Sequence, residues 1–135
     1  MTEEWVNLVR RMYEEAWNQG KLEVIDEHAP DYIGIGPHGE EHSPDSVKRG
    51  VTNRRLAFPD IHVTIEDIIS AKDKVVARLT FRGTHKGEFQ GIQPTNKKVE
   101  WSGIWIYRVG NGKFVERWHN YHSLGLMQQL GAIRA

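Results

Sequence analysis

The sequence predicts a single α+β domain over residues 1–135, in which helices come first and an antiparallel sheet follows. Apolar residues recur at three- and four-residue spacing as far as Phe58, which is the period of a helix face. From Ile61 onward they alternate with a period of two, which indicates strands. A length of 135 residues without a repeat, linker or low-complexity tract suits one domain with one core.

Three segments of the first half have helical spacing. The first runs from a candidate N-cap at Thr2 to a stop at Gly20, and its apolar face comprises Trp5, Leu8, Val9, Met12, Tyr13 and Ala16. A short helix over 21–28 and a short strand over 31–35 are expected next. The third helix begins at Ser43-Pro44 and ends before Pro59, with Val47, Val51, Arg54 and Phe58 at helical spacing.

The second half predicts four strands and a last short helix. The strands are expected over 61–65, 75–81, 99–109 and 113–122, and the helix over 124–130 between a cap at Ser123 and a stop at Gly131. The turn at 110–112 joins the last two strands into a hairpin.

Pairing through Asn111-Gly112 places Trp105 opposite Trp118 and Trp101 opposite His122. One face of this hairpin then mixes aromatic and polar groups: Trp101, Gly103, Trp105, Tyr107, Glu116, Trp118, Asn120 and His122. That mixture is typical of a small-molecule pocket, although each tryptophan also suits ordinary core packing. The opposite face comprises Ser102, Ile104, Ile106, Arg108, Val115, Arg117, His119 and Tyr121. Its aliphatic residues predict a homodimer formed through this face.

Composition excludes several classes of partner. Lysine plus arginine balances aspartate plus glutamate, 18 against 18, so nucleic acid is not an expected partner. No apolar run is long enough to span a membrane, and the start is acidic, so we expect a soluble cytoplasmic protein. The absence of cysteine removes disulfides, thiolate nucleophiles and cysteine-based zinc sites.

Other motifs predict no chemistry. The glycine pattern over 34–39 matches a dinucleotide fingerprint, but Pro37 spoils the helix start that would hold a phosphate. His119 and His122 are three apart on a strand and point to opposite faces, so no metal site is expected. The basic pairs at 54–55 and 97–98 are expected to be solvated surface, and no serine nucleophile elbow occurs.

Four segments carry a family resemblance. They read FPDIH at 58–62, RGTHKGEFQGIQPT at 82–95, VERW at 115–118 and LGLMQQLG at 124–131. In this order, over nearly the whole chain, they resemble the SnoaL-like polyketide cyclases. The resemblance implies the cone-shaped fold of nuclear transport factor 2 and ketosteroid isomerase, in which helices pack on the concave face of a curved sheet around an apolar pocket. It also implies an intramolecular aldol reaction that uses an aspartate as acid and base, without metal or organic cofactor. His122 takes the place of that aspartate here.

The candidate catalytic residues are therefore His122 and His85. An imidazole titrates near neutral pH and suits removal of a proton beside a carbonyl. Each histidine also has a structural alternative, a bond to the last helix for His122 and a turn contact for His85. The candidate substrate-binding residues are Trp118, Asn120, Trp105, Trp101, Tyr32 and Trp17, and core packing suits Trp17 equally well.

Three functions are open at this point. The first is acid/base catalysis of cyclisation or isomerisation on a small apolar carbonyl compound. The second is a binding module that holds a small hydrophobic molecule without turning it over, favoured by the missing aspartate. The third is a dimeric interaction domain with a vestigial pocket.

Overall fold

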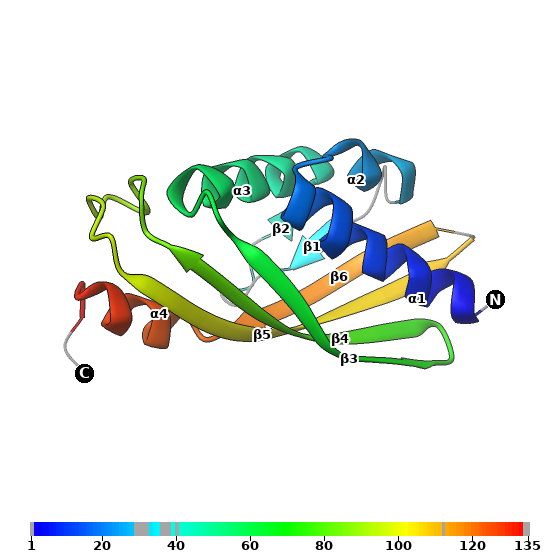
Figure 1. Ribbon diagram of the computed structural model, residues 1–135. Helices are drawn as coiled ribbons and strands as arrows, with labels where there is room; N and C mark the ends of the chain where they lie inside the picture. The colour runs from blue at the N-terminus through cyan, green and yellow to red at the C-terminus, as the bar shows by residue number, and fades with distance from the viewer. Residues whose placement is uncertain (1, 29–32, 36–38, 40, 112, 134–135) are drawn as a thin grey trace.

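The computed structural model describes residues 2–28, 33–35, 39, 41–111 and 113–133. It confirms the α+β fold: one curved six-stranded sheet whose concave face is covered by helices (Figure 1). The strand order is β2-β1-β6-β5-β4-β3. Four of these strands form an antiparallel meander, namely β3 (His62–Ala71), β4 (Lys74–Thr84), β5 (Lys98–Gly110) and β6 (Lys113–Tyr121).

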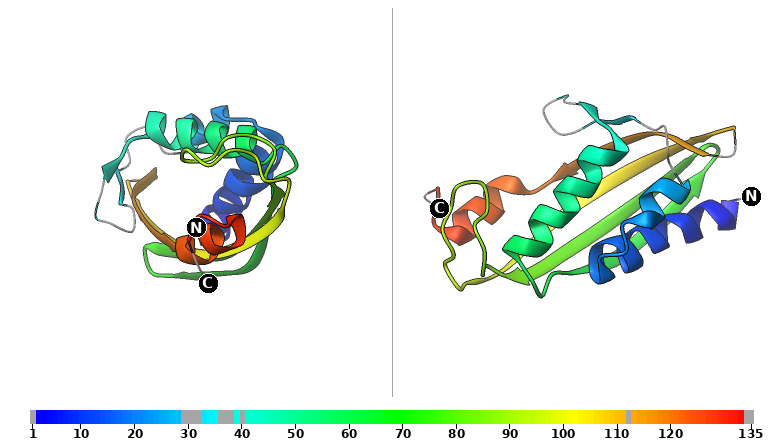
Figure 2. Two further views of the ribbon diagram at one scale, coloured as in Figure 1. Left: turned by 90° about the vertical axis from the view of Figure 1, so that its left-hand side faces the viewer. Right: turned by 90° about the horizontal axis from the view of Figure 1, so that it is seen from above.

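The sheet is extended past β6 by two short strands. β1 (Ile33–Ile35) pairs with β6 in parallel, and β2 (Glu41–His42) pairs with β1 in antiparallel fashion. In the end-on view of Figure 2 the sheet curves beneath the helices, which close its open side. The core lies between this concave face and the helices. In the part of the chain that the structure describes, no helix is long and apolar enough to cross a membrane.

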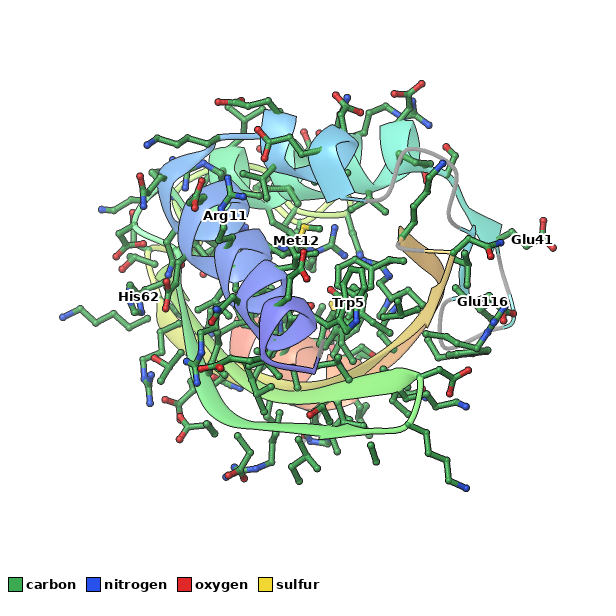
Figure 3. The ribbon with its side chains drawn as sticks, turned by 90° about the vertical axis from the view of Figure 1, so that its right-hand side faces the viewer. Trp5, Arg11, Met12, Glu41, His62 and Glu116 are labelled. Carbon is green, nitrogen blue, oxygen red and sulfur yellow. The ribbon has the colours of Figure 1, made fainter. Side chains whose placement is uncertain are left out.

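The first helical segment changes type along its length. α1 (Thr2–Arg11) continues into a π-helix, η1 (Met12–Trp17), where the sequence predicts an unbroken α-helix. The wider π turn leaves Met12, Tyr13, Ala16 and Trp17 all buried. Figure 3 shows Trp5 directed toward the interior, where its ring lies 6.1 Å from that of Phe114.

The other helices follow their predicted signals closely. α2 (Glu23–His28) is short, and α3 (Pro44–Ala57) begins as expected, with the Ser43 side chain accepting a hydrogen bond from the Ser46 amide. α4 (Ser123–Leu130) ends at Gly131, which has a φ of 81°. The predicted cap at Ser123 is wrong by one residue: His122 is the N-cap, and its side chain makes no capping bond.

Two side-chain amides attach helical segments to strand backbone. The Asn18 amide donates to the Val63 carbonyl and accepts from the Val63 amide, at 3.1 and 2.7 Å. The Gln129 side-chain amide donates to the Glu100 carbonyl at 2.7 Å and accepts from the Glu100 backbone amide at 2.9 Å. Both amides satisfy backbone groups that would otherwise need another partner. They hold η1 and α4 at defined positions on the sheet.

The β5–β6 hairpin contains a β-bulge that the sequence does not reveal. Next to the turn, Val109 pairs with Phe114, but the next pair is Arg108 with Glu116. Val115 is therefore an extra residue on β6. From that point to the end of β6, the register is one residue away from the predicted one, and every β6 side chain changes face.

Candidate functional site

A cavity of about 530 Å³ lies between α3, η1, α4 and the inner face of the sheet. Its apolar wall comprises Trp17, Val47, Val51, Phe81, Trp101, Trp105, Leu124, Met127 and Ile133, with Gly50. Its polar wall comprises Ser46, Arg54, Gln90, Arg117, His119, Tyr121 and Ser123. A mostly apolar cavity with a few convergent polar groups has the composition of a small-molecule site.

The aromatic rings of this wall form one connected surface. Phe81 stacks on Trp101, with ring centres 5.3 Å apart and planes 2° from parallel. Trp17 meets Phe81 edge-on at 5.1 Å, and Trp105 lies 5.4 Å from Phe81. Because Phe81 pairs with Trp101 across β4 and β5, the strand register itself creates this stack.

β6 contributes polar groups beside this surface. Trp105 pairs with His119, and their rings stack at 4.9 Å with an angle of 12°. Tyr107 pairs with Arg117, and Gly103 pairs with Tyr121. These three β6 residues therefore share the inner face with the tryptophans of β5.

The predicted face of β6 is wrong for this reason. Trp118 and Asn120 pair with Ile106 and Ile104, which lie on the outer face of the sheet. Figure 3 shows that Glu116 also points away from the interior. Residues expected to lie outside, namely Arg117, His119 and Tyr121, line the cavity instead.

The remaining predicted site residues divide into two groups. Trp17, Trp101 and Trp105 line the cavity, whereas Trp118, Asn120, His122 and His85 are not among its lining residues. Tyr32 lies outside the residues that the structure describes.

His122 lies at the junction between β6 and α4, with an exposed side chain. Its amide donates to the Ser102 carbonyl at 2.8 Å, and its carbonyl accepts from the Leu126 amide at 3.2 Å. Its ring lies against Gly125, where any Cβ would overlap the imidazole. The backbone of His122 and the contact of its ring with Gly125 join it to the last helix, but its side chain makes no capping bond. Its catalytic role stays a prediction.

His85 is fully buried beside Phe58, with ring centres 5.5 Å apart. Its Nδ1 accepts a hydrogen bond from the Thr95 amide at 3.2 Å, and the Thr95 hydroxyl lies 3.1 Å from the same atom. His85 joins the two ends of the 85–95 segment, and its proposed role in catalysis also stays a prediction.

Arg54 corrects a second expectation. Instead of being solvated surface, it is half-buried and lines the cavity. Its guanidinium lies over the Phe89 ring at 5.7 Å and donates to the Gly50 carbonyl at 3.3 Å. Its neighbour Arg55 is also half-buried and donates to the Trp17 carbonyl at 2.6 Å. The helical spacing of Arg54 with Val47 and Val51 was the signal that it faces inward.

The permanently charged side chains in the described lining of the cavity have one sign. They are two arginines, Arg54 and Arg117, and none of the described lining residues is an aspartate or glutamate. Within the described ranges, no group of three or more histidine, aspartate or glutamate side chains is placed to hold a metal ion.

Comparison with known proteins identifies the family. The family model of SnoaL-like polyketide cyclases matches residues 7–130. The chain is 31% identical over 134 residues to the aklanonic acid methyl ester cyclase DnrD of Streptomyces peucetius, covering 93% of this chain and 90% of that protein.

Two solved structures share the architecture closely. AclR of Streptomyces galilaeus, named as a proposed hydroxylase, has a TM-score of 0.90 and 31% identity, covering 100% of this chain and 85% of that chain. Wild-type IdmH of Streptomyces antibioticus, named as a proposed polyketide cyclase, has a TM-score of 0.81 and 30% identity, covering 93% and 96%. The family match spans most of the chain and includes the strands and helices that line the cavity, so the chain belongs to the SnoaL-like polyketide cyclase family.

Proposed function

We propose that the protein catalyses the cyclisation or isomerisation of a small apolar carbonyl compound in this cavity, by acid/base chemistry alone. The observation that carries the proposal is His119, a titratable base stacked on Trp105 within an aromatic-walled cavity. The 31% identity to a methyl ester cyclase supports a ring-closing reaction.

The reaction that this arrangement suits is an intramolecular aldol addition. His119 removes a proton from the carbon next to one carbonyl group, and the resulting enolate attacks a second carbonyl carbon of the same molecule. One C–C bond forms, the second carbonyl becomes an alkoxide, and the proton returns from the imidazolium to that oxygen. The product is an isomer of the substrate, so no co-reactant is needed.

Arg117 and Tyr121 supply the electrostatic part of this mechanism. Both lie on the same face of β6 as His119 and line the same cavity. A guanidinium or phenol donor directed at an oxyanion stabilises the enolate and the alkoxide more than it stabilises the neutral ketone.

The geometry favours His119 over His122 and His85 as the base. A base must reach the proton that it removes, and only His119 among these three lines the cavity. His122 and His85 remain the competing candidates that the experiment must separate.

Turnover of aklanonic acid methyl ester by four histidine variants tests the proposal. His119→Gln should lower kcat about a hundredfold or more, since general-base catalysis contributes about 10²–10⁴-fold. His122→Gln and His85→Gln should retain turnover. His62→Gln is the matched control, because His62 is exposed on β3 and points outward in Figure 3.

Loss of turnover in His122→Gln with retention in His119→Gln would overturn the assignment of the base. If the wild-type protein binds this ester and the corresponding free acid and converts neither, the binding-module function replaces the enzymatic one. We further infer that the ligand is a small hydrophobic molecule and that the protein is a homodimer through the outer sheet face, which is tested below.

A further inference from the structure

The cavity is lined by a cation, Arg54, that has no carboxylate partner among the described residues. Arg54 projects from α3 into the cavity, and its contacts are the Gly50 carbonyl and the Phe89 ring. Among the described residues, no carboxylate forms an ion pair with it. Four other arginines of the chain form ion pairs: Arg11 with Glu15 and Glu27, Arg78 with Asp67, Arg82 with Glu100, and Arg108 with Glu116.

A second guanidinium lines the same cavity from a different wall. Arg117 projects from β6 and is 8% exposed. Two cations that line one cavity repel each other, and an anionic group of a ligand between them relieves this repulsion. No acidic residue is among the described residues that line this cavity.

The walls specify the rest of the ligand. The rings of Phe81 and Trp101 stack on each other, as do those of Trp105 and His119, so this side of the cavity is aromatic. An aromatic wall favours an aromatic ring in the ligand, through offset or edge-to-face contacts. A guanidinium binds a carboxylate through two parallel N–H···O hydrogen bonds, which the negative charge strengthens. A methyl ester has no negative charge, so it binds the same guanidinium more weakly.

We infer that the ligand of this cavity is a planar aromatic compound bearing a free carboxylate, and that Arg54 selects the acid over its methyl ester. This inference deepens the proposed function, because it names the substrate class of the same site. By this inference the ligand of this chain differs from that of its relative DnrD, whose name specifies a methyl ester.

The test compares anthraquinone-2-carboxylate with its methyl ester by isothermal titration calorimetry. The wild-type protein should bind the acid about tenfold to a hundredfold more tightly, the range expected for charge-assisted hydrogen bonds. Arg54→Gln should bring the two dissociation constants within about threefold of each other, and Arg54→Lys should keep part of the preference.

Arg49→Gln is the matched control. Arg49 is exposed on the same helix, five residues earlier, and is absent from the cavity lining. The control removes the same charge from the molecule, so it should leave the preference for the acid unchanged. An equal effect of the two variants would mean that general electrostatics, and not Arg54, selects the acid.

Two results would overturn the inference and leave the proposed function intact. One is equal affinity for acid and ester in the wild-type protein, with both affinities weakened by Trp105→Phe. The other is a loss of kcat on the methyl ester in Arg54→Gln without a change in the affinity ratio, which would make Arg54 a stabiliser of the enolate. Failure of the proposed function has a different signature, namely tight binding of the acid with no turnover of any carbonyl substrate.

Discussion

The Asp60 carboxylate joins the turn after α3 to the end of β4. It accepts a hydrogen bond from the Thr84 amide at 2.7 Å and another from the Thr84 hydroxyl at 2.8 Å. The amide bond is the main cause of the lowered pKa of the Asp60 carboxyl, and the hydroxyl bond adds to it. Both residues belong to segments that carry the family resemblance, FPDIH and RGTH. Their role here is structural.

Replacing this carboxylate should lower stability in a pH-dependent way. Because the folded pKa lies below the unfolded value of about 3.9, ionised Asp60 favours the folded state. The stabilisation is complete above the unfolded pKa and is lost as the pH falls through the folded pKa. Asp60→Ala should therefore lower the free energy of unfolding by about 1 kcal/mol at pH 7, and by less near pH 3. Urea denaturation at both pH values measures the difference, and an equal cost at both would contradict the explanation.

At the scale of the secondary-structure element, the hairpin register decides which tryptophans belong to the cavity. Trp105 and Trp118 lie on adjacent strands, but the bulge at Val115 places them on opposite faces. Trp105 is 5% exposed and lines the cavity, while Trp118 is not part of the lining.

This register makes a direct prediction for binding. Trp105→Phe should raise the dissociation constant of anthraquinone-2-carboxylate about tenfold, since a smaller ring gives up part of the stacking surface. Trp118→Phe makes the same substitution on the opposite face, so it should change this dissociation constant by less than twofold. Calorimetry on both variants, with circular dichroism to verify the fold, measures the contrast. The reverse order of effects would show that the register has no bulge.

At the scale of the whole molecule, the outer face of the sheet remains apolar in part. Ile104 is 47% exposed and Ile69 is 61% exposed, and both lie on strands of this face. Ile106 and Val115 are half-buried on the same hairpin. Exposed aliphatic residues that gather on one face indicate a contact with another protein surface.

The homodimer prediction rests on this face. Sedimentation equilibrium at micromolar concentration should give twice the mass of 15.6 kDa. Ile104→Glu should give a monomer with an unchanged circular dichroism spectrum, because a buried unpaired charge opposes association. Leu56→Glu is the control, since Leu56 is also an exposed aliphatic residue, at 68%, but lies on α3. A wild-type protein that sediments only as a monomer would exclude this interface.

Local signals predicted most of the elements. The Ser43-Pro44 start of α3, the stop at Gly131 and the alternation of β4 and β5 follow from interactions within a few residues, which a sequence displays directly. The tryptophan wall also followed, because alternation along β5 alone puts Trp101 and Trp105 on one face.

The sequence by itself thus determined the α+β class, the family and the aromatic half of the cavity. Tertiary structure decided the polar half. A bulge arises from the pairing of two strands, so one strand's sequence does not reveal it. Because Val115 is an extra residue on β6, Arg117 and His119 lie on the inner face in place of the predicted Trp118 and Asn120. The parallel pairing of β1 with β6 likewise joins segments that are distant in sequence. Periodicity specifies which side chains alternate, but only the packed sheet specifies which of them face the cavity.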